Sequence, residues 1–69
     1  MKEEYNHKQY FERFLGKFIY VSKKVGSQTL AFKGECLEIL EDKLIINDVR
    51  EGEIPLSYDY LSVTGVEDL

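Results

Sequence analysis

The sequence predicts a single, mainly β domain in which a short helix precedes five antiparallel strands that bend into a small barrel. Three observations lead to this prediction. The chain has 69 residues, 43% hydrophobic and 32% charged, which suits one compact core and not a disordered segment. Helical spacing of large apolar side chains ends at Gly16, and β-branched and aromatic runs follow. The longest of these runs contains Gly34, a residue type that lets a strand bend sharply.

The first element is expected to be an amphipathic helix over about residues 7–15. Asn6 and Gln9 have the spacing of a capping box, in which the Asn6 side chain accepts from the first free backbone N–H groups. Gly16 stands where a left-handed residue would end the helix. One stripe carries four large apolar side chains, namely Tyr10, Phe11, Phe14 and Leu15. So short a helix is unstable alone, and the stripe is therefore expected to dock on the sheet.

Two strands and a turn are expected next. The first strand covers about residues 17–24, and Gly26 in the turn that follows can adopt a positive φ. The second strand covers about residues 29–40, roughly twice the usual length, with Gly34 at its bend. Phe32 and Cys36 flank Gly34 at two-residue spacing and should share its face.

Three shorter strands complete the predicted order, over about residues 43–47, 53–56 and 61–66. Pro55 has no backbone N–H, which favours a sheet edge or a strand end for the fourth strand. Residues 57–60 fit a single helical turn. A helix followed by five short strands, the second long and kinked at a glycine, is the outline of an SH3-like barrel.

Two stretches of this outline resemble the Sm-like superfamily of small barrels. The first is Phe32-x-Gly34-x-Cys36-Leu37-x-Ile39, followed by Glu41-Asp42. The second is Glu53-Ile54-Pro55-Leu56, followed by Tyr60-Leu61-Ser62-Val63. The resemblance implies an Sm-like (SH3-like) barrel that acts by associating with RNA, ribonucleoprotein or protein surfaces.

Within this superfamily, residues 11–66 are most similar to the C-terminal domain of the ribosome maturation factor RimP. The similarity begins at Phe11-x-x-Phe14-Leu15-Gly16-Lys17. Ring-forming Sm proteins have a nucleotide pocket built from an Asn-ended loop after the second strand and an Arg-Gly pair near the fourth. Here these places read Glu41-Asp42-Lys43-Leu44 and Ile54-Pro55-Leu56-Ser57. The standard uridine pocket is therefore not expected.

The side chains that catalysis or metal binding would need are sparse, so the sequence favours a binding protein over an enzyme. His7 is the only histidine and Cys36 the only cysteine, which leaves neither a metal-ligand set nor a nucleophile–base pair. Cys36 is expected in the core, and no internal disulfide can form. Glu41 and Asp42 are expected to be ordinary solvated turn acids. We therefore expect no cofactor and no metal.

The net charge of −4 is unevenly spread, because residues 1–35 carry seven bases and four acids while residues 36–69 carry two bases and nine acids. An acidic chain starts at a disadvantage in binding phosphate groups. The apolar runs are far shorter than the ~20 residues that span a bilayer, and the polar N-terminus does not look like a signal peptide. A cytoplasmic location without a membrane partner is expected.

The candidate contact for RNA or a protein partner is a basic and aromatic surface. Lys23, Lys24 and Lys33 belong to the first predicted hairpin and would together meet phosphate or an acidic segment, unless they serve only solubility. Tyr58 and Tyr60 would stack on bases, unless one of them closes the end of the barrel.

A second candidate surface is the pair of outer strands. Sm-like barrels form rings by pairing the fourth strand of one subunit with the fifth of the next. Pro55 counts against a long continuous pairing, and both a monomer and a homo-oligomer stay open. The candidate subunit contacts are Glu53, Ile54, Leu56, Ser62 and Thr64.

Three functions remain open on these grounds. The preferred one is a non-catalytic Sm-like interaction module that binds a protein or ribonucleoprotein partner, with self-association left open. The alternative is an RNA-binding Sm-like oligomer that uses the basic hairpin surface. The third is an accessory piece of an enzyme.

Overall fold

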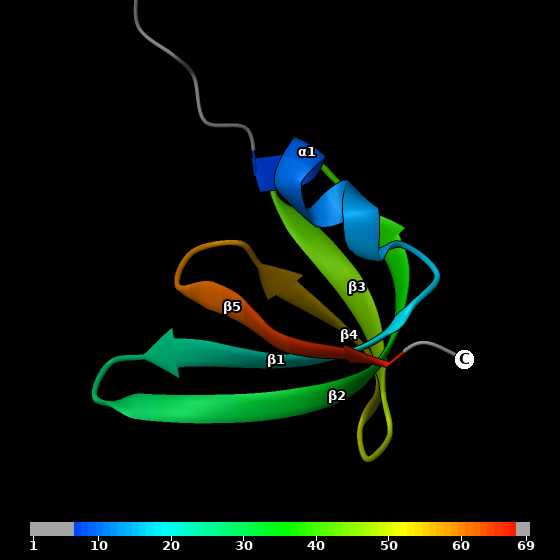
Figure 1. The fold of residues 1–69 in the computed structure, drawn as a ribbon. Helices are drawn as coiled ribbons and strands as arrows, with labels where there is room; N and C mark the ends of the chain where they lie inside the picture. The colour runs from blue at the N-terminus through cyan, green and yellow to red at the C-terminus, as the bar shows by residue number, and fades with distance from the viewer. Residues whose placement is uncertain (1–6, 68–69) are drawn as a thin grey trace, which may run out of the picture.

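A computed structural model describes residues 7–67, which form a short helical segment and a five-stranded antiparallel sheet (Figure 1). This mainly β architecture confirms the coarse prediction from the sequence, and each predicted strand boundary lies within one residue of the observed one. The elements are helix α1 (His7–Phe11), a 3-10 turn (Glu12–Phe14) and strands β1 (Phe18–Val25), β2 (Gln28–Ile39), β3 (Lys43–Asp48), β4 (Gly52–Ser57) and β5 (Leu61–Glu67). The described residues include no helix long and apolar enough to cross a bilayer.

The N-terminal helical segment differs from the single helix that was predicted. α-Helical bonding ends at Phe11, and the chain then tightens into the 3-10 turn. A 3-10 turn has three residues per turn, so Phe11 and Phe14 come onto one face and both are buried. Leu15 is 52% exposed, so the expected four-residue stripe contributes only two core side chains. Asn6 of the predicted capping box lies outside the described residues.

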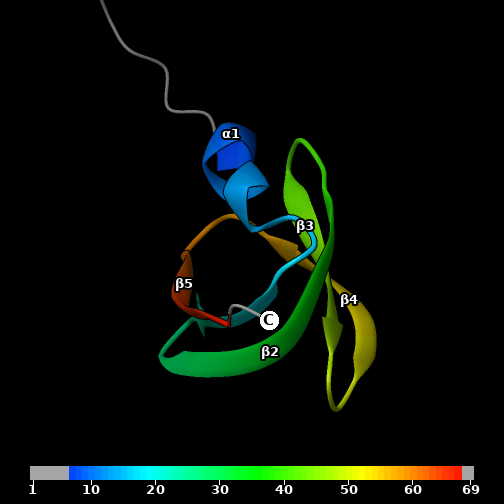
Figure 2. The same ribbon diagram turned by 45° about the vertical axis from the view of Figure 1, so that its right-hand side comes forward.

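The strands follow the order β4-β3-β2-β1-β5, and the sheet curls around one inner face (Figure 2). Buried residues occupy every second position in the first half of β1 and along β3, with partly buried or exposed residues between them, as the two-residue period of a strand requires. The helical segment lies across one end of the curl and is tied there by backbone hydrogen bonds between Gly16, Lys17 and Cys36. The core consists of Phe11, Phe14, Ile19, Val21, Cys36, Leu44, Ile46, Leu56, Tyr58 and Leu61.

Gly34, where the sequence predicted the bend of β2, is the point of closest approach to β3. A β-carbon built on Gly34 would lie 1.9 Å from the backbone carbonyl oxygen of Asn47, so any larger residue collides with β3. β2 pairs with β1 over residues 28–35 and with β3 over residues 34–39, so Gly34 lies where β2 changes partner. Phe32 and Cys36 share the inner face, which was also predicted.

The sheet is not closed into a barrel, and this part of the prediction is wrong. β4 pairs with β3 and β5 pairs with β1, but β4 and β5 do not pair with each other. The end of β4 is instead held to β1 by the ammonium group of Lys23, which donates to the carbonyl and hydroxyl oxygens of Ser57. A side chain thus holds β4 where a closed barrel would have backbone hydrogen bonds between β4 and β5. Among residues 7–67, no strand pairs with the outer side of β4 or of β5.

Replacing Gly34 with alanine tests the close approach of β2 and β3. Because the obstructing atom belongs to the backbone, we expect Gly34→Ala to lower the free energy of unfolding by about 3 kcal/mol or more. Gly65→Ala is the matched control, since its new β-carbon would meet only the side chain of Tyr20, at 3.3 Å. That ring can shift, and a loss of about 1 kcal/mol or less is expected. Urea unfolding followed by circular dichroism measures both, and equal losses would contradict the prediction.

Candidate functional site

β4 and β5 are the two outer strands of the sheet, so each has one side that no other strand of the sheet covers. On β4, Glu53 is exposed, Ile54 packs partly against the core, and Leu56 is only 5% exposed. On β5, Ser62 and Thr64 are exposed. The sequence therefore placed these residues correctly on the two outer strands, but the Leu56 side chain faces the core and is not available to a partner.

The two edges are unequally protected. β4 carries Pro55, which lacks a donor, and the charged Glu53, two devices that blunt an edge strand. β5 has no proline, and its first charged residue is Glu67 at its end. A bulge interrupts the pairing of β5 with β1 opposite Tyr20, and the Thr64 hydroxyl donates to the Tyr20 carbonyl oxygen at 3.2 Å. The bulge is itself a device that protects an edge, but β5 lacks the proline and the mid-strand charge found on β4, and it is the edge better suited to accept another strand.

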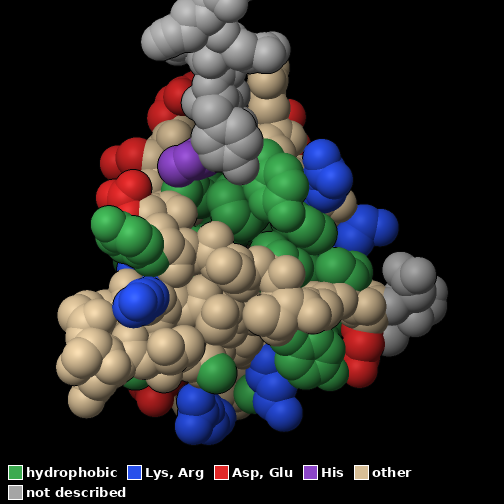
Figure 3. Space-filling model, turned by 60° about the vertical axis from the view of Figure 1, so that its left-hand side comes forward, with side chains coloured by type: hydrophobic (Ala, Val, Ile, Leu, Met, Phe, Trp, Pro, Cys, Tyr) green, Lys and Arg blue, Asp and Glu red, His purple; other side chains and the backbone are tan. Residues whose placement is uncertain are grey.

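A shallow groove runs between α1 and β5, beside that free edge. It encloses about 330 Å³ and its lining includes Tyr10, Phe11, Leu61 and Val63. Figure 3 shows apolar side chains gathered on this side of the molecule. If a partner strand paired with β5, every second side chain of that partner strand would point to the side of the sheet on which this groove lies.

The three candidate lysines do not converge. Lys24 pairs with Thr29 and Lys33 pairs with Tyr20, so both lysines lie on the outer face of the β1–β2 hairpin. The Lys24–Thr29 pair and the Tyr20–Lys33 pair are four residues apart along β1, which corresponds to about 13 Å. Lys23 is one residue from Lys24 and points to the opposite face. The expectation of a single basic cluster on this hairpin is therefore wrong.

Lys23 has a structural role that the sequence did not reveal. Its ammonium group donates to the Ser57 carbonyl oxygen at 3.2 Å, the Ser57 hydroxyl at 2.9 Å and the Asp59 carbonyl oxygen at 2.5 Å. All three acceptors lie more than thirty residues away along the chain, so no local pattern could indicate them. Lys23 therefore links β1 to the β4–β5 turn and is not a free cation for a ligand.

The two candidate tyrosines differ completely in environment. Tyr58 is 5% exposed, its ring stacks on Phe11 at 4.8 Å between centroids, and its hydroxyl donates to the Leu40 carbonyl oxygen. Burial raises the pKa of Tyr58 to about 12. Tyr60 is 77% exposed and has a φ of 58°, a left-handed conformation that is rare for a bulky residue. Tyr58 is thus the tyrosine that closes the core, and only Tyr60 is available for stacking.

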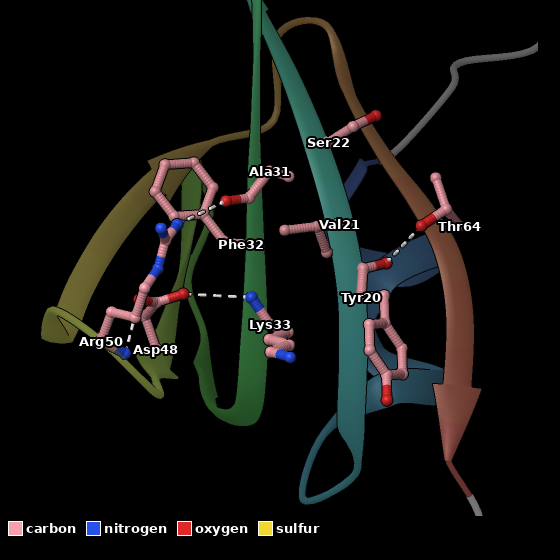
Figure 4. A pocket seen from close by; sticks show the side chains of 9 residues that line it. All are labelled: Tyr20, Val21, Ser22, Ala31, Phe32, Lys33, Asp48, Arg50 and Thr64. Carbon is pink, nitrogen blue, oxygen red and sulfur yellow. Dashed lines mark hydrogen bonds between the residues drawn. The ribbon is translucent and has the colours of Figure 1, made fainter.

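A pocket of about 430 Å³ lies beside the β1–β2 hairpin (Figure 4). Tyr20 and Lys33 line it from the hairpin, and Arg50 reaches it from the β3–β4 turn, where its Nη2 donates to the Ala31 carbonyl oxygen at 3.4 Å. The Tyr20 hydroxyl donates to Glu67 at 2.9 Å, and this hydrogen bond raises the pKa of Tyr20. Sequence reasoning missed Arg50, because it reaches the hairpin only through the folded β3–β4 turn.

Asp48, at the rear of this pocket, organises the β3–β4 turn. Its carboxylate is buried and accepts from the backbone N–H groups of Lys33, Arg50 and Glu51 at 2.9–3.0 Å. Burial by itself would raise the pKa of Asp48, but these three hydrogen bonds and the nearby charge of Arg50 hold it below its ordinary value. Asp48 is fully engaged within the fold, which makes it a turn-forming residue and not an acid–base group.

Cys36 is fully buried, as predicted, and burial raises the pKa of its thiol to about 11. A thiol in this setting is protonated at neutral pH and inaccessible to a substrate. Within residues 7–67, no three His, Cys, Asp or Glu side chains gather in the manner of a metal site.

Comparison of the chain with protein-family models, curated proteins and solved structures finds no significant match. The similarity to Sm-like barrels therefore stays a prediction from the sequence. The roles of the surfaces above have to be inferred from their geometry and chemistry.

Removing the hydroxyl oxygen of Tyr58 tests how much its hydrogen bond to Leu40 stabilises the fold. Tyr58→Phe keeps the stacked ring but leaves the Leu40 carbonyl oxygen without its donor, so we expect the free energy of unfolding to fall by about 1 kcal/mol. Tyr60→Phe is the matched control and should leave stability unchanged, because the Tyr60 side chain is exposed. Chemical denaturation at neutral pH compares the two, and an equal effect of both changes would contradict the assignment.

The raised pKa values of Cys36 and Tyr58 predict a loss of stability in alkali. Their pKa values are about 11 and about 12 in the folded chain, against 9.0 and 10.0 for the free groups. The unfolded chain therefore releases these protons first, so stability is intact below about pH 9 and falls as the pH rises toward 12. Denaturation at a series of alkaline pH values should show a shallower decline in Cys36→Ala and in Tyr58→Phe. A decline of unchanged slope in both variants would refute the prediction.

Proposed function

We propose that this chain is a non-catalytic Sm-like interaction module that binds a protein or ribonucleoprotein partner and associates with further copies of itself through β4 and β5. The observation that carries the proposal is that both outer strands of the sheet have an unpaired side. A free strand edge binds through main-chain hydrogen bonds to an added strand, and neighbouring pockets select its side chains. The groove between α1 and β5 offers such a pocket beside the less protected edge.

The Sm-like assignment is supported by two features of the fold. A short helix precedes five antiparallel strands, and the long second strand bends at a glycine that has no space for a β-carbon. In Sm-like barrels the fourth strand pairs with the fifth strand of the next subunit. The corresponding strands of this chain, β4 and β5, are the two edges of its sheet.

Pairing between β4 of one copy and β5 of the next is head-to-tail, because the two edges differ. Head-to-tail contacts produce a ring where the rotation closes and a filament where it does not. Pro55 removes one donor from β4, which shortens the ladder that such a contact can form. We therefore expect reversible association that depends on protein concentration.

RNA binding, the alternative, has less support. Lys23 is occupied by the β4–β5 turn and Tyr58 is buried, which leaves Lys24, Lys33 and Tyr60 as the candidate contacts. Lys24 and Tyr60 are neighbours, since the Lys24 N–H donates to the Tyr60 carbonyl oxygen at 3.1 Å, but Lys33 lies about 13 Å away along the hairpin. The net charge of −4 also opposes binding to phosphate groups. A protein surface is the partner that fits this distribution better.

Light scattering coupled to size exclusion, over a range of protein concentrations, tests self-association. The wild-type chain is expected to show a mass above the 8.1 kDa of the monomer, rising with concentration. Lysines on an edge strand discourage pairing, so Ser62→Lys combined with Val66→Lys should shift β5 toward the monomer. The control is Gln28→Lys combined with Thr29→Lys, which adds the same charge at the tip of the β1–β2 hairpin. A wild-type chain that stays monomeric throughout, or equal behaviour of the two variants, would refute edge pairing.

A further inference from the structure

The outer face of β2, β3 and β4, on the side away from the core, carries a second surface that strand pairing does not use. The strand register places Glu35 beside Asn47 and Asn47 beside Glu53 in one row across the three strands. The next row holds Glu38, Ile45 and Pro55, with Leu37 beside Glu38 because the register shifts there. We call this surface, formed by Glu35, Leu37, Glu38, Ile45, Glu53 and Pro55, the glutamate-bordered face.

The centre of the glutamate-bordered face is apolar and partly open to solvent. Leu37 is 36% exposed, Pro55 is exposed, and Ile45 is half-buried between them. Their position on the outer face keeps these side chains out of the core cluster. An apolar group of this kind gains free energy when a partner removes it from water.

The border of the same face carries three exposed glutamates. Glu35, Glu38 and Glu53 are exposed, and within the described part of the chain none of them forms an ion pair. Two bases lie at the ends of this face: Lys33, two residues before Glu35 on the same side of β2, and Lys43, which is paired with Asp42 at 3.3 Å. Among the described residues of this face, the three carboxylates therefore outnumber the one lysine that has no acidic partner. The field at this surface therefore attracts cations and repels phosphate-bearing partners such as nucleic acids and anionic lipids.

We infer that the glutamate-bordered face binds a basic amphipathic helix of a partner protein. The apolar stripe of such a helix would cover Leu37, Ile45 and Pro55, while its lysines or arginines meet the surrounding carboxylates. Glu35 and Glu53 are two strands apart, or about 10 Å. Basic residues seven positions apart on a helix are separated by about 10.5 Å along its axis, so one heptad spans the pair.

This inference rests on the proposed role as an interaction module, but it uses a sheet face and not a strand edge. The two can therefore fail separately. Loss of self-association with peptide binding intact would remove edge pairing alone, and the reverse result would remove the present inference alone.

Binding of a synthetic peptide to the full chain tests the inference. The probe is a fluorescently labelled helical peptide of leucine and lysine with all leucines on one stripe, and fluorescence anisotropy reports its binding. The comparison peptide has the same composition in an order that forms no stripe. We expect the first to bind at least several-fold more tightly and to weaken as salt is added. Equal binding of the two peptides, or no binding of the first, would overturn the inference.

Variants locate the site on the protein. Glu35→Gln, Glu38→Gln and Glu53→Gln combined should weaken binding of the amphipathic peptide about tenfold. The matched control changes three exposed acids elsewhere and gives the same net charge, namely Glu12→Gln, Glu51→Gln and Asp59→Asn combined. An unchanged affinity in the first variant, or an equal loss in the control, would overturn the inference.

A second variant tests the apolar centre without changing charge. Leu37→Ser should weaken binding several-fold, and its partial exposure makes it tolerable to the fold. Thermal unfolding of every variant shows whether it is folded before its affinity is compared. If a combined variant does not fold, Glu35→Gln and Glu53→Gln are measured singly, and no effect of either would count against the site. Light scattering of the mixture shows whether the peptide binds one copy or displaces a second.

Discussion

The close approach of β2 and β3 at Gly34 determines the rest of this structure. The Asn47 carbonyl oxygen occupies the space where a β-carbon of residue 34 would lie. The two paired strands therefore approach at a distance that only glycine permits. The 12-residue strand β2 can then pair with β1 along its first part and with β3 along its second. The resulting curvature brings side chains from β1 and β3, such as Ile19 and Leu44, into one fully buried core.

The same curvature determines which faces and edges of the sheet are open to the partners proposed above. It directs one face of the sheet inward and leaves the other face, including Ile45 and Pro55, toward solvent. β4 and β5 stand at opposite ends of the strand order, and the curvature does not bring them into pairing. A domain of this size has little apolar surface to spare for its own core, so unpaired edges and a partly apolar outer face are surfaces suited to association.

Local signals in the sequence were sufficient for the elements but not for their closure. The strand limits and the bend at Gly34 follow from β-branched runs and from a glycine inside one of them. Closure would require β4 to pair with β5, a long-range contact, and here the Lys23 side chain on β1 holds the end of β4 instead. Local sequence could not show whether Tyr58 or Tyr60 is the buried ring, because both are tyrosines in the same turn. The difference comes from Phe11 and Leu40, which are distant in sequence and, of these two tyrosines, contact only Tyr58. The glutamate-bordered face escaped notice because the register shift beside Leu37 changes which side chains are neighbours.

The acceptors of the Lys23 ammonium group are two carbonyl oxygens and a hydroxyl, none of which carries a charge. A lysine held by a carboxylate loses its partner when acid protonates that group, whereas these acceptors do not titrate at moderately acidic pH. The connection between β1 and the β4–β5 turn should accordingly persist in acid. Acetylation of this one side chain, by contrast, would remove both the charge and two of its three donors.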